Sequence, residues 1–124
     1  MTGSLIAIYF TAVLFAIMGI GSIIAPTLTT SQFGIHELDR DGRNEVRAVY
    51  GGFGLAMAGV LIAAALIPHL RSGITLAIGM ALGGMAIGRI LSAAMDRGIG
   101  RKPAIYLCVE FIGFTLLLWA SNII

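Results

Sequence analysis

Four long apolar segments, separated by polar stretches, make up most of the chain. They cover residues 5–25, 46–67, 74–95 and 104–123. A helix that crosses a bilayer needs about 20 mostly apolar residues. None of the segments alternates between apolar and polar residues, as a membrane β-strand would. Because lipid offers no hydrogen-bond partners, such segments must be helical. The pattern predicts an all-α, polytopic integral membrane four-helix bundle, forming one domain over residues 1–124.

Proline and glycine mark the ends of these segments. Pro26 and Pro68 close the first and second, and Pro103 opens the fourth at a first-turn position, where its missing N–H costs little. Short loops are expected over 68–73 and 96–102. The longer segment over 26–45 is either a plain loop or includes a short helix that lies on the membrane surface. Residues 1–4 carry no basic side chain and no small-residue cleavage site follows the first segment, so we expect a retained span rather than a signal peptide.

Composition supports a membrane protein and narrows the chemistry. Hydrophobic residues form 58% and charged residues 11% of the chain, whereas soluble domains have about 25% charged residues. A net charge of +2 is too small for a nucleic-acid binder, so nucleic acid is excluded as a partner. Cys108 is the single cysteine, which excludes an internal disulfide. His36 and His69 are expected on opposite sides, so no metal site, cofactor or catalytic set is expected.

The distribution of basic residues predicts an orientation. Six lie in or beside the loops over 26–45 and 96–102, and only Arg71 falls on the other side; the six are Arg40, Arg43, Arg47, Arg97, Arg101 and Lys102. By the positive-inside rule these two loops are cytoplasmic and both termini lie outside. We expect the location to be a bacterial inner membrane.

Glycines are concentrated in the second and third spans. The third contains Gly79-x-x-x-Gly83 and Gly84-x-x-x-Gly88, and the second contains Gly51, Gly52 and Gly54. Small residues let membrane helices approach closely. We expect Gly51, Gly52, Gly54, Gly84 and Gly88 to pack helices, most simply the second against the third. A homo-oligomer contact and ordinary glycine enrichment of membrane helices remain open alternatives.

Charged residues within the spans indicate a site. Arg89 and Glu110 both lie roughly 10 Å inside the side that carries loops 26–45 and 96–102. Intramembrane charges are costly unless paired, so we expect Arg89 to pair with Glu110. Helical spacing places further polar residues on the same stripes. The predicted buried cluster is Glu45, Arg47, Tyr50, Arg89, Ser92, Asp96 and Glu110. For Arg47 and Asp96, extension of the side chain to the membrane interface is an equally open alternative. It serves either as structural glue or as a ligand-binding site.

The cluster coincides with a family pattern. The run from Glu45 to Gly52 (ExRAxYGG), then Gly88-Arg89-x-x-Ser92 with Asp96, then Glu110, resembles a bacterial family of small four-helix membrane proteins known only as a domain of unknown function. In size and layout this family is similar to the DoxX-like proteins. The resemblance covers the whole chain and implies the fold and the importance of these residues, but no reaction.

Three kinds of function fit these features. The first is binding of a small lipid-like or quinone-like molecule, with Arg47 and Arg89 on its polar head, alone or as an accessory subunit of a larger membrane complex. The second is a small proton-coupled transporter that works as an oligomer through Glu110. The third is a cofactor-free membrane enzyme of the isomerase or cyclase type, using Glu110 or Asp96 as general acid or base. Membrane lipid is a partner in every case.

Overall fold

The computed structural model describes residues 2–122, and these residues are helical almost throughout. Residues 2–122 contain no β-strand. The helices, in chain order, are α1 (Thr2–Ile24), α2 (Pro26–Ser31), α3 (Arg40–Val46), the π-helical segment η1 (Arg47–Gly52), α4 (Phe53–Leu66), α5 (Pro68–Met95) and α6 (Arg101–Ala120). The predicted all-α class is confirmed.

Within residues 2–122 the chain has four helices long and apolar enough to cross a membrane, which indicates a membrane location. They are Thr2–Ile24, Arg40–Leu66, Pro68–Met95 and Arg101–Ala120. The second of these is continuous from α3 through η1 to α4. It begins earlier than expected because Asp39 caps α3: its carboxylate accepts a hydrogen bond of 2.7 Å from the Gly42 N–H.

The prediction that residues 68–73 form a loop is wrong. These residues are the first turns of α5, and Ile67, with extended backbone, is the N-cap that separates α4 from α5. Pro68 occupies the first turn of α5, where a helix needs no N–H donor. Pro26 opens α2 in the same way, inside the segment expected to be a plain loop or to include a short helix. Both prolines therefore end one helix by starting the next.

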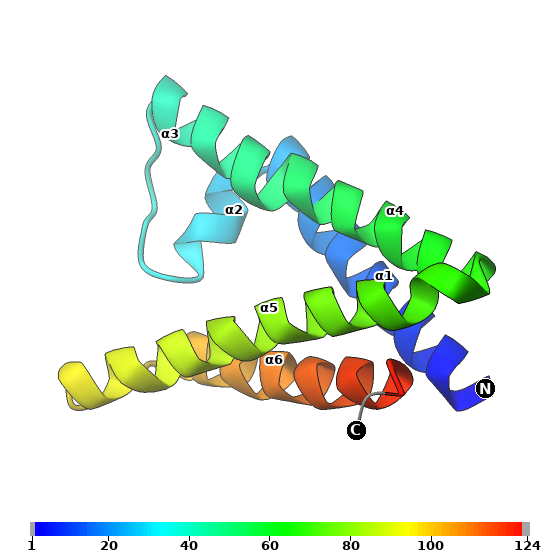
Figure 1. Cartoon of the computed structure of the whole chain (residues 1–124). Coiled ribbons are helices and arrows are strands. Elements are labelled where there is room, and N and C mark those ends of the chain that lie inside the picture. The colour runs from blue at the N-terminus through cyan, green and yellow to red at the C-terminus, as the bar shows by residue number, and fades with distance from the viewer. Residues whose placement is uncertain (1, 123–124) are drawn as a thin grey trace. The chain divides into compact units, whose positions relative to one another are not determined.

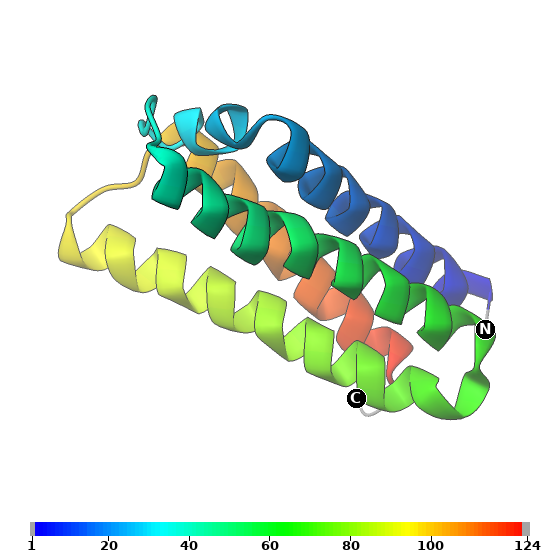
Figure 2. The same cartoon turned by 90° about the horizontal axis from the view of Figure 1, so that it is seen from above.

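The chain divides into two compact units, residues 9–62 and residues 1–8 with 63–124. In the first unit, α1 packs against the helix formed by η1 and α4 (Figure 2). Glycines line this contact. A Cβ added to Gly19 would lie 2.8 Å from the carbonyl oxygen of Gly51 and from the backbone nitrogen of Leu55. Gly54 faces Phe15 and Met18 at similar distances. The backbone of α1 approaches that of η1 and α4 closely because glycine has no side chain at these contact positions.

The second unit is built on the antiparallel pair α5 and α6, which pack against one another (Figure 1) and diverge toward the connection between them (Figure 2). Their apolar contact includes the buried side chains of Ile78, Leu82, Ala86 and Leu117. The short connection over 96–100 reverses the chain between them. This pair carries the candidate site.

Candidate functional site

Glycines bring α5 and α6 together. A Cβ added to Gly83 would lie 2.6 Å from Cδ1 of Phe114, and one added to Gly79 would lie 3.2 Å from Cβ of Leu117. On α6, a Cβ at Gly113 would lie 2.8 Å from Cδ1 of Leu82. Side chains of one helix thus occupy the space that a methyl group would fill on the other. The close approach lets polar side chains further along the two helices meet.

Arg89 of α5 and Glu110 of α6 form an ion pair with two hydrogen bonds, as the sequence predicts. The Arg89 Nε donates to Glu110 Oε1 at 2.6 Å, and Nη2 donates to Oε2 at 2.9 Å. This is the fork-to-fork geometry that makes arginine–carboxylate pairs strong and directional. The Glu110 side chain is only 7% exposed and that of Arg89 26%. A carboxylate so buried is tolerable because the guanidinium satisfies both oxygens.

Tyr106 adds a third member from α6. Its ring lies under the guanidinium, with the Arg89 Cζ 5.7 Å from the ring centroid. This distance is within the range of a cation–π contact. Tyr106 and Glu110 are four residues apart on α6 and so share one face of that helix. Together they hold Arg89 from two sides.

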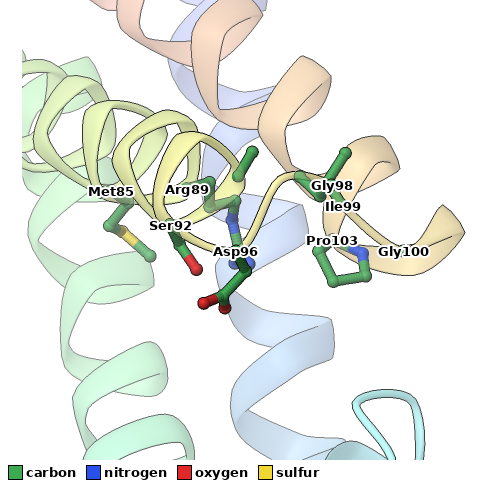
Figure 3. A pocket seen from close by; sticks show the side chains of 10 residues that line it. Met85, Arg89, Ser92, Asp96, Gly98, Ile99, Gly100 and Pro103 are labelled. Atoms are coloured by element: carbon green, nitrogen blue, oxygen red, sulfur yellow. The ribbon is translucent and has the colours of Figure 1, made fainter.

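A cavity of about 480 Å³ lies beside the ion pair. Figure 3 shows Arg89, Ser92 and Asp96 on one side of α5, with Pro103 of α6 beyond the connecting segment. Met85 and Ile99 form an apolar part of the cavity wall. The cavity is thus polar at the guanidinium, the hydroxyl and the carboxylate, and apolar elsewhere. This combination is typical of sites for small amphipathic molecules.

The end of α5 shapes the rim of this cavity. The Gly98 N–H donates to the carbonyl of Ala93 at 2.9 Å, and Arg97 has a positive φ of 55°. This is the arrangement of a Schellman motif, in which glycine is the usual residue at the left-handed position. Here arginine occupies that position. The turn directs residues 98–100 across the rim and into α6.

The seven predicted site residues fall into two groups. Arg89, Ser92, Asp96 and Glu110 lie in the unit that holds α5 and α6, and the first three line the cavity. Glu45, Arg47 and Tyr50 lie in the unit of residues 9–62. Glu110 is buried and Arg89 half-buried, but the expected burial is wrong for Glu45, Tyr50 and Ser92, which are exposed. Arg47 and Asp96 are also exposed, in agreement with the alternative placement of their side chains. Helical spacing predicts which residues share a face of a helix, but not whether other parts of the protein cover that face.

Arg47 has a contact that spacing does not predict. Its Nε donates to the backbone carbonyl of Ile23 at 2.9 Å, near the C-terminal end of α1. Helix ends leave carbonyl groups without intrahelical partners, and a cation is favoured there. Arg47 is also the first residue of the π-helical segment η1. The most specific part of the sequence pattern, residues 45–52, therefore includes the π-helical turn beside α1.

The glycines of the second and third spans face different helices. Gly51 and Gly54 face α1, and Gly79 and Gly83 face α6; the expected contact of the second span with the third is not the one these glycines make. A Cβ added to Gly84 or Gly88 would meet nothing within 4 Å, and one at Gly52 only the carbonyl of Arg47. Successive residues point about 100° apart around a helix. Only one of the two overlapping glycine patterns can face α6.

Sequence reasoning missed a second set of polar residues in the same unit. Arg71, placed in a loop from the sequence, is 9% exposed, and Thr75 is fully buried. The Arg71 Nε and Nη2 donate to the carbonyls of Ala64 and Ala65 at 3.0 and 2.8 Å. A basic residue a few positions after a proline that follows an apolar helix is the signal that would have indicated such a cap.

No cluster of three or more histidine, cysteine, aspartate or glutamate side chains able to hold a metal ion occurs among residues 2–122. The groups that could contact a bound molecule are therefore the guanidinium, hydroxyl and carboxylate groups of the cavity.

Comparisons with known proteins give a family but no activity. No curated protein and no solved structure matches the chain significantly. A family model described as a domain of unknown function, DUF4345, matches residues 4–121. The matched region includes all of the unit of residues 9–62, nearly all of the other unit, and every residue of the candidate site. The chain is therefore a member of the DUF4345 family.

Proposed function

We propose that the cavity beside Arg89 and Glu110 binds the polar head of a small lipid-like or quinone-like molecule. The observation that carries this proposal is the placement of Arg89, held by two hydrogen bonds to the buried Glu110, at the wall of a cavity of about 480 Å³. Sites for small ligands typically have volumes of 300–1,000 Å³, mostly apolar walls and a few fixed polar groups.

The ion pair supports a binding role for Arg89. Glu110 and the ring of Tyr106 hold the guanidinium in one orientation. A fixed arginine loses little side-chain entropy when it binds a planar or anionic oxygen group. Both oxygens of Glu110 accept from Arg89, so we assign Glu110 to positioning the guanidinium rather than to carrying protons in transport. The Ser92 hydroxyl supplies a hydrogen-bond donor, and the Asp96 carboxylate supplies acceptor oxygens, for the rest of the head group.

The apolar part of the ligand would follow the apolar wall. Met85 and Ile99 line the cavity next to its polar groups. In a bilayer such a wall continues into the hydrocarbon region, so a tail can extend along α5 without contacting water. As part of the same proposal, this end of α5 lies on the cytoplasmic side of a bacterial inner membrane, with the termini outside. The excess of basic residues in the loops supports this orientation.

Identification of small molecules that co-purify with the protein tests this function. The wild type is compared in mild detergent with Ser92→Leu, which places a larger apolar side chain in the cavity and keeps both residues of the ion pair, and with the double variant Arg89→Gln, Glu110→Gln, which leaves no buried unpaired charge. The matched control is Arg40→Gln, because Arg40 is exposed and lies outside the cavity. Circular dichroism confirms that each variant is folded.

We expect one molecule, with a polar head and an apolar tail, in the wild type and the control, and its loss in both cavity variants. Retention of the same molecule by all four proteins would place its site elsewhere. If no molecule is found in any of them, and added quinones and phospholipids do not raise the melting temperature, the ion pair serves only to join α5 and α6.

A further inference from the structure

A second polar site lies near the other end of α5. Arg71 and Arg89 are separated along α5 by about 27 Å at 1.5 Å per residue. Around Arg71 a cavity of about 170 Å³ is lined by Ser4, Pro68, Arg71, Ser72, Ser121 and Asn122, among others. All of these residues belong to the unit of residues 1–8 and 63–124. Among residues 2–122, no residue lines both this cavity and the one at Arg89.

Among the residues that the structure describes, Arg71 is a buried cation without a carboxylate partner. Its two hydrogen bonds go to the backbone carbonyls of Ala64 and Ala65, and no salt bridge to it is present between residues 2 and 122. Carbonyls at a helix C-terminus carry only about half a unit of negative charge. A guanidinium that is 9% exposed is therefore only partly compensated.

Two donors at this cavity have no partner within the described part of the chain. The Nη1 group of Arg71 and the hydroxyl of Ser4 make no hydrogen bond there, although the Ser4 residue is 7% exposed and Arg71 9%. No fully inaccessible side-chain nitrogen or oxygen atom among residues 2–122 lacks a partner. Both groups are therefore reachable, and the cavity that they line is where a partner would reach them.

We propose that this cavity binds a phosphate oxyanion, either from a phospholipid head group or free in solution. Arginine Nη1, the Ser4 hydroxyl and the Asn122 amide are hydrogen-bond donors of the kind that phosphate oxygens accept. The N-terminus of α5, which carries Pro68, lines the same cavity and favours negative charge. Between residues 2 and 122, no aspartate or glutamate lines it.

The size of the cavity agrees with this ligand. A water molecule takes about 30 Å³ of liquid, so about 170 Å³ has room for a phosphate group but is well below the 300–1,000 Å³ of sites for drug-sized ligands. A phospholipid would insert its phosphate and leave its glycerol and acyl chains outside. A free phosphate ion would fit entirely.

The decisive variant is Asn122→Asp. It places a carboxylate at the exposed end of the cavity, where it can act as the missing counter-ion of Arg71 and repel phosphate. Asn44→Asp is the matched control, because Asn44 is also exposed and lies in α3, outside the cavity. A second variant, Ser4→Ala, removes one donor and leaves the Arg71 bonds to α4 intact.

Two measurements distinguish the sources of phosphate. In the first, sodium phosphate is titrated against sodium chloride at equal ionic strength in a non-ionic detergent, and the melting temperature is followed. In the second, the protein is equilibrated with phosphatidylglycerol vesicles, extracted, and examined by native mass spectrometry for retained lipid. Wild type, control and both variants are compared in each.

We expect a saturable rise in melting temperature with phosphate, or retained phosphatidylglycerol, in the wild type and in Asn44→Asp. Asn122→Asp should melt at a higher temperature without ligand and lose at least tenfold in affinity, and Ser4→Ala should lose several-fold. A response to phosphate alone indicates the free ion, and retention of lipid alone indicates the head group. No response in either measurement, or equal responses in Asn122→Asp and Asn44→Asp, would overturn the proposal and leave Arg71 as a cap of α4.

Discussion

Arg89 and Glu110, 21 residues apart on α5 and α6, are joined by two hydrogen bonds that use both oxygens of the carboxylate. The pair connects the two helices at the wall of the larger cavity. Because the Glu110 side chain is 7% exposed, its charge depends on the guanidinium for compensation. The two residues should therefore respond to mutation as one unit.

This coupling gives the first prediction. Arg89→Leu and Glu110→Leu should each lower the free energy of unfolding by about 3–5 kcal/mol, because each leaves a poorly compensated charge. The double variant should be more stable than either single variant. Unfolding by denaturing detergent measures all four proteins and gives the interaction energy. Additive losses would show that the two side chains do not stabilise one another.

A second prediction concerns the adjacent glycines of α5. Gly83→Ala should destabilise the protein by about 1–3 kcal/mol, because its Cβ would lie 2.6 Å from the ring of Phe114. Gly84→Ala should be neutral or slightly stabilising, because nothing lies within 4 Å of its Cβ and alanine favours the helix. The two variants add the same methyl group one residue apart. Equal effects on detergent-induced unfolding would contradict the packing of α5 against α6 through Gly83.

A similar pair of variants tests α1 in the other unit. Gly19→Ala should destabilise by about 1–3 kcal/mol, because the added methyl group would lie 2.8 Å from backbone atoms of Gly51 and Leu55, which cannot rotate away. Gly21→Ala has open space around its Cβ and should be tolerated. Thermal melting followed by circular dichroism compares the two. A stable Gly19→Ala protein would mean that α1 does not approach η1 and α4 so closely.

The fourth prediction concerns the turn that follows α5. Arg97 has a φ of 55°, a left-handed conformation that costs a non-glycine residue roughly 1 kcal/mol. Arg97→Gly should therefore raise the free energy of unfolding by up to about 1 kcal/mol. Arg97→Ala is the control: it removes the same charge but keeps the Cβ. If both variants have the same stability, the backbone at residue 97 is not left-handed.

Much of the candidate site could be predicted from the sequence, but not its extent. The pairing of Arg89 with Glu110 could be predicted from their depth in the membrane alone, because two opposite charges at the same depth compensate one another. Arg89, Ser92 and Asp96 could be placed on one stripe from their spacing, and all three line the cavity. Ser4 and Arg71 could not be brought together from the sequence, because residues so far apart in the chain meet only through packing.

The length of the apolar segments and their lack of alternation were enough to predict that this chain is helical and that four helices are long enough to cross a membrane, since lipid leaves no other backbone solution. Packing was needed to show that Gly83 rather than Gly84 faces α6, and that Arg71 is buried while Tyr50 is exposed. The physical reason is that composition and period give the faces of a helix, whereas the choice of the face that is covered depends on the shapes of neighbouring helices.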